Sequence, residues 1–163
     1  MMKHCRALYE QTLFSGYYYT KQDKIVHLKL QSAASIRHFF SGGWLEWYVL
    51  GKLLAEASRR KKNYHFSCAR SAKIHFPNED VHELDVVFLP AGKEPLIIEC
   101  KSGEYRRELD KYLALRKRLN IPVERFIILA TDLDEAQSKS LSAMYQLTFL
   151  SPEVLTTSVQ SLL

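Results

Sequence analysis

The chain has 163 residues, of which 47% are hydrophobic and 25% charged, a balance typical of one soluble globular domain rather than a disordered chain. No apolar run approaches the roughly 18 residues that a membrane span needs. The N-terminus shows no secretory signal, because Glu10 interrupts its apolar stretch. We therefore expect a cytoplasmic protein outside the membrane. The net charge of +5 mildly favours a polyanionic partner.

Two β-prone runs come first in the chain, at 14–19 and 25–30, and a polar segment joins them, which predicts a hairpin. We interpret its three consecutive tyrosines, 17–19, as packing or as a dimer surface; a base-stacking platform is the alternative. A helix is predicted over 43–59. The segment 64–76 is expected to be one strand or a bent pair of strands. The remaining expected elements, in chain order, are strands at 84–89 and 96–101, a helix at 104–119, a strand at 125–131, a helix at 133–144, a strand at 146–150 and a helix from 152.

This order of elements predicts an α/β fold whose mixed central sheet is flanked by helices. We expect a single domain over 1–163, in which residues 1–38 form an N-terminal hairpin extension, 39–150 the core and 151–163 a C-terminal helix.

Two carboxylates and an amine are expected to converge on the segment 83–103. If this segment is a hairpin centred on Gly92, Asp85 lies opposite Glu99, and directly opposed residues share one face of a sheet. Lys101 falls on the same face because it is two residues beyond Glu99. Cys100 points to the opposite layer.

Paired carboxylates repel each other, and a hard cation such as Mg²⁺ or Mn²⁺ relieves the repulsion. Such a metal can bind a scissile phosphate oxygen, and Lys101 can orient the attacking water or offset transition-state charge. The alternative is a solvent-facing salt bridge on a sheet. The apolar residues flanking Asp85 and Glu99 favour the functional interpretation, since burying paired carboxylates without a function is costly.

A third carboxylate lies on the helix predicted over 43–59. Glu46 falls within the apolar stripe formed by Val49, Leu50, Leu53 and Ala57, where a glutamate is out of place unless something requires it. One interpretation is that Glu46 pairs with a buried basic group such as Lys101. The other is that Glu46 is an outer metal ligand or orients a metal-bound water.

The set Asp85, Glu99, Lys101 and Glu46 resembles the PD-(D/E)XK restriction-endonuclease-like superfamily. The segments 42–46 (GGWLE), 83–87 (ELDVV) and 98–102 (IECKS), together with the leucines at 113–119, resemble the nuclease domain of CRISPR ancillary nucleases, which cyclic oligoadenylate activates. The resemblance runs from about residue 40 to 150. Two positions depart from the pattern, because His82 stands in place of an asparagine and Trp47 in place of an acidic residue.

The resemblance implies a Mg²⁺- or Mn²⁺-dependent endonuclease acting on DNA or RNA as a homodimer, in CRISPR-linked or other antiviral defence. It implies metal ligation by Asp85, Glu99 and the backbone carbonyl of Cys100, with Glu46 nearby and Lys101 as the catalytic lysine. The family's cyclic-nucleotide sensor is not expected within these residues. A catalytically idle nucleic-acid-binding or assembly module on the same fold is the alternative function.

Basic residues that could contact phosphate form two groups. We expect Arg106 and Arg107, just after Lys101, and the run Arg59, Arg60, Lys61 and Lys62 to bind nucleic acid without sequence specificity. A solvated helix face is the alternative for both. His82 is expected to support the site from just outside it.

Overall fold

The computed structural model describes residues 2–60, 63–77 and 81–163, and it divides the chain into two compact units, Met1–Trp44 and Leu45–Leu163. The first unit contains α1 (Met2–Glu10), the antiparallel strands β1 (Phe14–Thr20) and β2 (Ile25–Leu30), α2 (Ala34–His38) and a π-helical turn (Phe39–Gly43). The predicted hairpin is thus confirmed. The helix α1 was not predicted.

A small aromatic contact holds the first unit together. Phe14 is buried and stacks on Phe40, with 5.3 Å between the ring centroids. Gly42 has φ 140°, which only glycine adopts readily, and this conformation ends the π-helical turn before the next helix.

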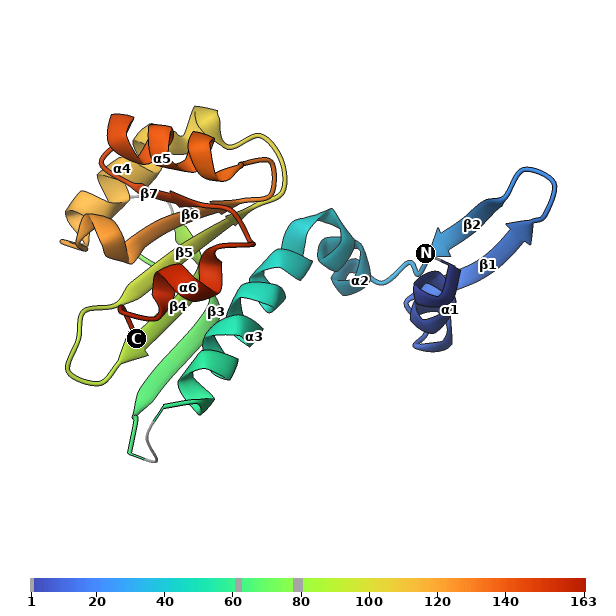
Figure 1. Ribbon diagram of the computed structural model, residues 1–163, viewed down its shortest axis with the longest axis horizontal. Coiled ribbons are helices and arrows are strands. Elements are labelled where there is room, and N and C mark those ends of the chain that lie inside the picture. Colours follow the sequence, from blue (N-terminus) through green and yellow to red (C-terminus); the bar gives the residue numbers. More distant parts are fainter. Residues whose placement is uncertain (1, 61–62, 78–80) are drawn as a thin grey trace. The chain divides into compact units, whose positions relative to one another are not determined.

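The second unit is built on a mixed five-stranded sheet of order β3-β4-β5-β6-β7 (Figure 1). Its strands are β3 (Phe66–Ile74), β4 (His82–Pro90), β5 (Leu96–Lys101), β6 (Phe126–Ala130) and β7 (Thr148–Leu150). The pairs β3–β4 and β4–β5 are antiparallel, and β5–β6 and β6–β7 are parallel. This architecture confirms the α/β fold with a mixed central sheet flanked by helices.

Helices cover both faces of this sheet (Figure 1). One core packs α3 (Trp44–Ser58) and α6 (Leu155–Val159) against the sheet through Leu45, Val49, Leu53 and Leu155. The other core lies under α4 (Leu109–Arg118) and α5 (Glu135–Met144). Side chains of β5 alternate between the two cores, since Ile97 joins the second and Ile98 the first.

Two predicted helices are shorter in the structure than the sequence suggested. The helix expected over 104–119 begins with a 3₁₀ turn (Arg106–Glu108), because Tyr105 has a φ of −133° and so lies outside the helical region. The helix expected from Pro152 begins only at Leu155. By contrast, β5 has the predicted bounds.

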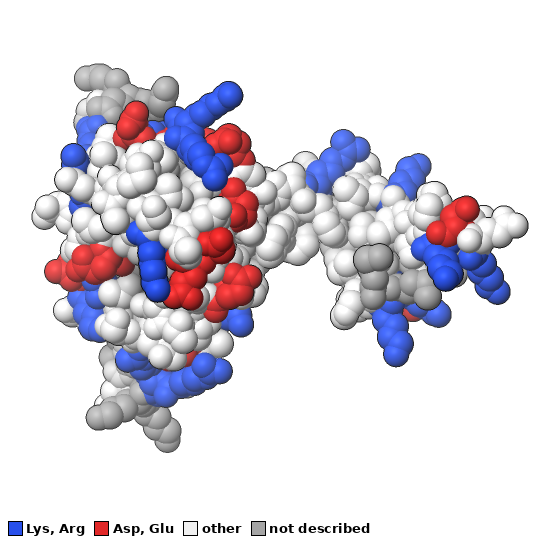
Figure 2. Space-filling view, turned by 45° about the horizontal axis from the view of Figure 1, so that its top comes forward, with Lys and Arg blue, Asp and Glu red and all other residues white. Residues whose placement is uncertain are grey.

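Most of the net positive charge of the chain lies in the first unit. Residues 1–44 contain six lysines and arginines against two acidic residues, so four of the five net positive charges lie there. Figure 2 shows both signs interspersed over the second unit. Among the described residues, no helix is long and apolar enough to span a membrane.

Candidate active site

The strands β4 and β5 separate at the point where the predicted carboxylates lie. Their register is the expected one, but the ladder ends at the pair Val86–Ile98. Asp85 and Glu99, the next residues along each strand, therefore make no backbone pair with each other. Instead, the backbone N–H of Cys100 donates to Oδ2 of Asp85 at 2.7 Å. A carboxylate thus takes the place of a backbone carbonyl.

The ladder on the other side of Asp85 is interrupted as well. Arg70 pairs with Val86 and Ala72 with Leu84, while Ser71, between them, has a φ of +53°. This left-handed conformation is uncommon for a residue other than glycine. Asp85 on β4 is therefore left out of the backbone ladders with both neighbouring strands, β3 and β5.

Lys101 links the two carboxylates. Its Nζ lies 3.2 Å from Oδ2 of Asp85 and 3.3 Å from Oε2 of Glu99. Burial alone would lower the pKa of Lys101, but the charges of Asp85 and Glu99 outweigh burial and raise it above its ordinary value. The ring of Tyr112 lies 5.1 Å from Nζ, and Lys101 is thus held as a cation.

Glu99 is the buried member of the set, with 2% of its surface exposed. Burial first, and then the charge of Asp85, raises the pKa of Glu99 to about 7. Its Oε1 is buried and has no hydrogen-bond partner within the described part of the chain. A buried carboxylate oxygen without a donor costs free energy that a hard cation would offset, so this atom fits Mg²⁺ or Mn²⁺.

The thiol of Cys100 lies close enough to the charged groups of the site to feel all of them. Burial raises its pKa, and the negative charges of Asp85, Glu46 and Glu99 raise it further. As predicted, its side chain packs toward the core under α3, on the other side of the strand from Ile97. The fourth predicted residue, Glu46, therefore approaches from the α3 side.

Glu46 is buried in the first turn of α3, with 8% of its surface exposed, but it is already paired. Its Oε2 accepts from Arg70 at 2.7 Å and from the hydroxyl of Ser71 at 3.2 Å. No hydrogen bond or ion pair joins Glu46 to Asp85, Glu99 or Lys101 in the described chain. No three His, Cys, Asp or Glu residues among those described are grouped closely enough to hold a metal.

Replacing Arg70 with methionine should destabilise the second unit by about 2 kcal/mol, because the buried Glu46 carboxylate loses its charged donor. The measurement is urea unfolding of the Arg70→Met, Glu46→Gln and double variants. We expect the double variant to be more stable than the sum of the single losses implies. Strict additivity would mean that the ion pair contributes nothing.

The structure does not bring the remaining predicted residues into the set. His82 begins β4 and packs edge-on against Phe76, with ring centroids 5.5 Å apart. Arg106 is exposed and lies 3.6 Å from Asp132 and 3.8 Å from Glu104. Arg107 is also exposed. Arg106 and Arg107 are therefore accessible to a phosphate, although Arg106 is partly neutralised.

The basic run after α3 lies away from the carboxylates. Arg59 and Arg60 follow the C-terminal end of α3, whereas Glu46 lies in its first turn, roughly 20 Å away along the axis. Arg59 donates to Glu56, and Arg60 donates to the carbonyl of Gln160. This placement does not support a phosphate track leading from them to the site. Lys61 and Lys62 lie outside the described residues.

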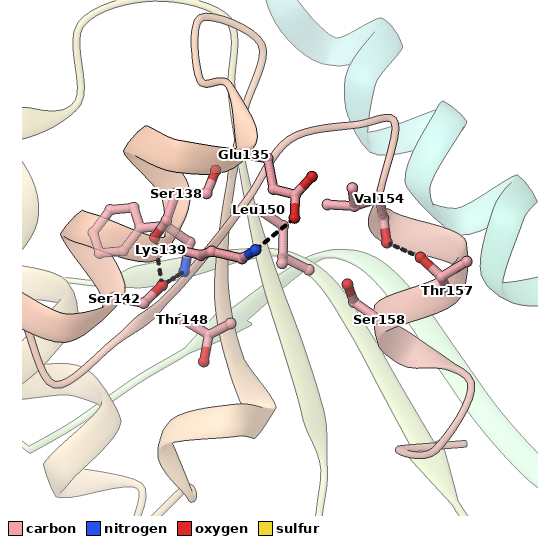
Figure 3. A pocket seen from close by; sticks show the side chains of 10 residues that line it. Glu135, Ser138, Lys139, Ser142, Thr148, Leu150, Val154, Thr157 and Ser158 are labelled. Atoms are coloured by element: carbon pink, nitrogen blue, oxygen red, sulfur yellow. Dashed lines mark hydrogen bonds and ion pairs between the residues drawn. The ribbon is translucent and has the colours of Figure 1, made fainter.

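A separate hollow of about 420 Å³ opens between α5, β7 and α6 (Figure 3). Serine and threonine hydroxyls line it, beside the exposed pair Lys139–Glu135, whose charged atoms are 2.6 Å apart. None of the predicted site residues lines this hollow. The candidate site is instead the fork between β4 and β5.

Two residues of the site were not anticipated as such. Tyr112, expected only as part of the apolar stripe of its helix, borders Lys101 and donates through its hydroxyl to Glu108 at 2.7 Å. Tyr112 lies one turn after Leu109 on the buried side of α4, and this spacing could have indicated a contact with β5. Arg70 carried no signal, since one arginine in a β-prone run is ordinary.

Comparison with known proteins shows similarity of fold alone. No family model matches the chain, and no curated protein matches it. Can2 from Sulfobacillus thermosulfidooxidans, solved in complex with cyclic tetra-adenylate, superposes with a TM-score of 0.66 at 19% identity, covering 96% of this chain and 44% of that chain. Protein VC1899 from Vibrio cholerae superposes with a TM-score of 0.66 at 18% identity, covering 99% and 41%. The chain thus has the fold of less than half of each of these two longer proteins.

Proposed function

We propose that this chain is a divalent-metal-dependent nuclease of the PD-(D/E)XK type, hydrolysing phosphodiester bonds of DNA or RNA. The observation that carries the proposal is the buried, unpartnered Oε1 of Glu99 beside Asp85, with Lys101 between the two carboxylates. A buried acceptor without a donor calls for an explanation, and a bound metal would supply one, since this oxygen has lone pairs free to ligate it.

In this proposal Asp85 and Glu99, with the backbone carbonyl of Cys100, hold Mg²⁺ or Mn²⁺. A divalent cation bound there supplies Lewis acidity toward a phosphate oxygen and makes water more acidic. Lys101 orients the attacking water or stabilises the charge that develops on the phosphate. Glu46 would join only after leaving Arg70, so its role is to position water or to assist metal binding.

The wider setting of the activity is part of the same proposal. The fold shared with a protein solved with cyclic tetra-adenylate supports the CRISPR-linked, antiviral role that the sequence resemblance implies. We further propose a cytoplasmic homodimer, in which two sites act on two strands. Arg106 and Arg107 are the phosphate contacts that lie next to the site in sequence.

A cleavage panel tests the function. Plasmid, single-stranded DNA and RNA are incubated with the protein and Mg²⁺, Mn²⁺ or a chelator, and products are resolved on gels. We expect cleavage only with metal, and loss of cleavage in Asp85→Asn, which removes a charged metal ligand. The exposed Asp110 on α4 provides the matched control, Asp110→Asn, which should cleave normally. Full cleavage by Asp85→Asn or in chelator would exclude the proposal.

A catalytically idle nucleic-acid-binding module is the second candidate. It is favoured by the pairing of Glu46 with Arg70, which leaves two carboxylates for a metal, and by the net charge of residues 1–44. This candidate predicts binding that weakens as salt rises, with no cleavage under any metal condition. The same panel, with binding measured alongside, separates the two.

A further inference from the structure

Trp47 presents an exposed aromatic surface on α3, next to the ion pair that Arg70 forms with Glu46. It follows the buried Glu46 on α3, yet 54% of its surface is exposed. The guanidinium of Arg70 lies 4.4 Å from the centroid of its ring. Since the same guanidinium donates to Glu46 at 2.7 Å, Arg70 fixes both side chains at once.

This aromatic surface is tied to Asp85 through β3. Ser71 donates to Glu46 at 3.2 Å and is the residue of β3 that lies between the two pairs flanking Asp85. Adjacent strands of a sheet lie about 4.8 Å apart. Arg70, Glu46 and Ser71 thus connect Trp47 to the strand that lies next to Asp85.

The chemistry of this surface suits a nucleobase. An exposed indole backed by a guanidinium offers a flat, polarisable face next to a positive charge, and aromatic side chains of this kind stack on bases. A base stacked inside a duplex cannot present its face to a protein, whereas an unpaired base can. The mostly negative cluster beyond Arg70 does not attract phosphate by itself, so the base is the part recognised here.

We infer that Trp47, backed by Arg70, stacks on an unpaired base of the bound nucleic acid. The inference rests on the proposed nuclease function. It also gives a role to Trp47, which stands where the resembling nucleases lead us to expect an acidic residue.

Tryptophan fluorescence can test the stacking directly, without metal or cleavage. The chain has two tryptophans, so Trp44→Phe leaves Trp47 as the only tryptophan, whose emission can be excited selectively over that of the tyrosines. This variant is titrated in chelator and low salt with a thymidine homopolymer, and separately with an abasic oligomer of equal length. We expect the homopolymer to quench the emission and the abasic oligomer to leave it unchanged.

Affinity measurements on the full chain complete the test. Trp47→Ala should weaken homopolymer binding at least about fivefold, Trp47→Phe should restore most of it, and binding of the abasic oligomer should not change. Leu54→Ala is the matched control, since Leu54 is an exposed apolar residue two turns further along α3, and it should bind normally.

Three results would overturn the inference: emission unchanged by saturating homopolymer, an equal loss of both oligomers in Trp47→Ala, or no binding of either oligomer. Metal-dependent cleavage together with any of these would mean that stacking fails while the nuclease function stands. Quenching and base-dependent affinity without cleavage would mean that Trp47 stacks on bases while the nuclease function fails.

Discussion

Lys101→Met is expected to reduce metal-dependent cleavage by about 10²–10³-fold, the size of effect seen when one donor that stabilises transition-state charge is removed. This large loss is expected because Nζ of Lys101 lies 3.2 Å from Asp85 and 3.3 Å from Glu99. Both carboxylates raise the pKa of the amine there and keep it charged. Methionine preserves much of the side-chain volume and removes only the charge. Initial rates at saturating substrate are the measurement.

Two further variants separate catalysis from folding. Lys73→Met removes an exposed lysine from β3 of the same sheet and should cleave at the normal rate. Lys101→Arg keeps the charge but not the compact ammonium, so little activity should return. Thermal melting verifies that each variant is folded. An unchanged rate in a folded Lys101→Met would remove the lysine from the mechanism.

Glu99→Gln is expected to stabilise the metal-free protein by about 3 kcal/mol at pH 8, because a raised pKa of about 7 in place of 4.5 makes ionisation costly in the folded state. Below about pH 4.5 Glu99 is protonated in both folded and unfolded chains, so the penalty is absent there. Between about pH 4.5 and 7 only the unfolded chain loses the proton, and the stability of the natural chain falls. Urea unfolding across this range measures the fall.

The same experiment reports on metal without any substrate. At about pH 8, Mg²⁺ or Mn²⁺ should recover part of the lost stability in the natural chain, because a ligand that binds only the folded state stabilises it. Glu99→Gln should respond weakly. Glu83→Gln, which removes an exposed carboxylate from β4, should follow the natural chain at every pH. A flat profile in the natural chain would contradict the assigned ionisation of Glu99.

The central sheet could be predicted because its strands are short apolar runs bounded by turns. The segment at 96–101 was found with the correct ends, and the turn at Gly92 fixed the register of β4 and β5. Elements that bury little were missed. The helix α1 is short and mostly exposed, and its apolar side is narrow, with only Cys5 and Leu8 half-buried, so it was not distinguished from an irregular N-terminus.

The convergence of Asp85, Glu99 and Lys101 followed from pairing and alternation, which are local rules. The pairing of Glu46 with Arg70 did not follow from these rules. Arg70 lies 24 residues after Glu46 and reaches it only when α3 packs on β3. The distortion at Ser71 and Asp85 also escaped prediction, since regular alternation assumes an uninterrupted ladder. The sequence thus predicts which groups meet, and tertiary packing determines which of them are already paired.

The surroundings of Cys100 have a consequence for its reactivity toward electrophiles. A thiol reacts as the thiolate, and at the partly buried Cys100 desolvation and then the charges of three carboxylates disfavour that anion. Cys100 is therefore protected against alkylation and peroxide in the metal-free protein, although it stands between two catalytic candidates. Cys68 on β3 is exposed and so is open to reagents in solution. Oxidative damage to the chain should accordingly begin at the sheet edge and spare the centre of the proposed site.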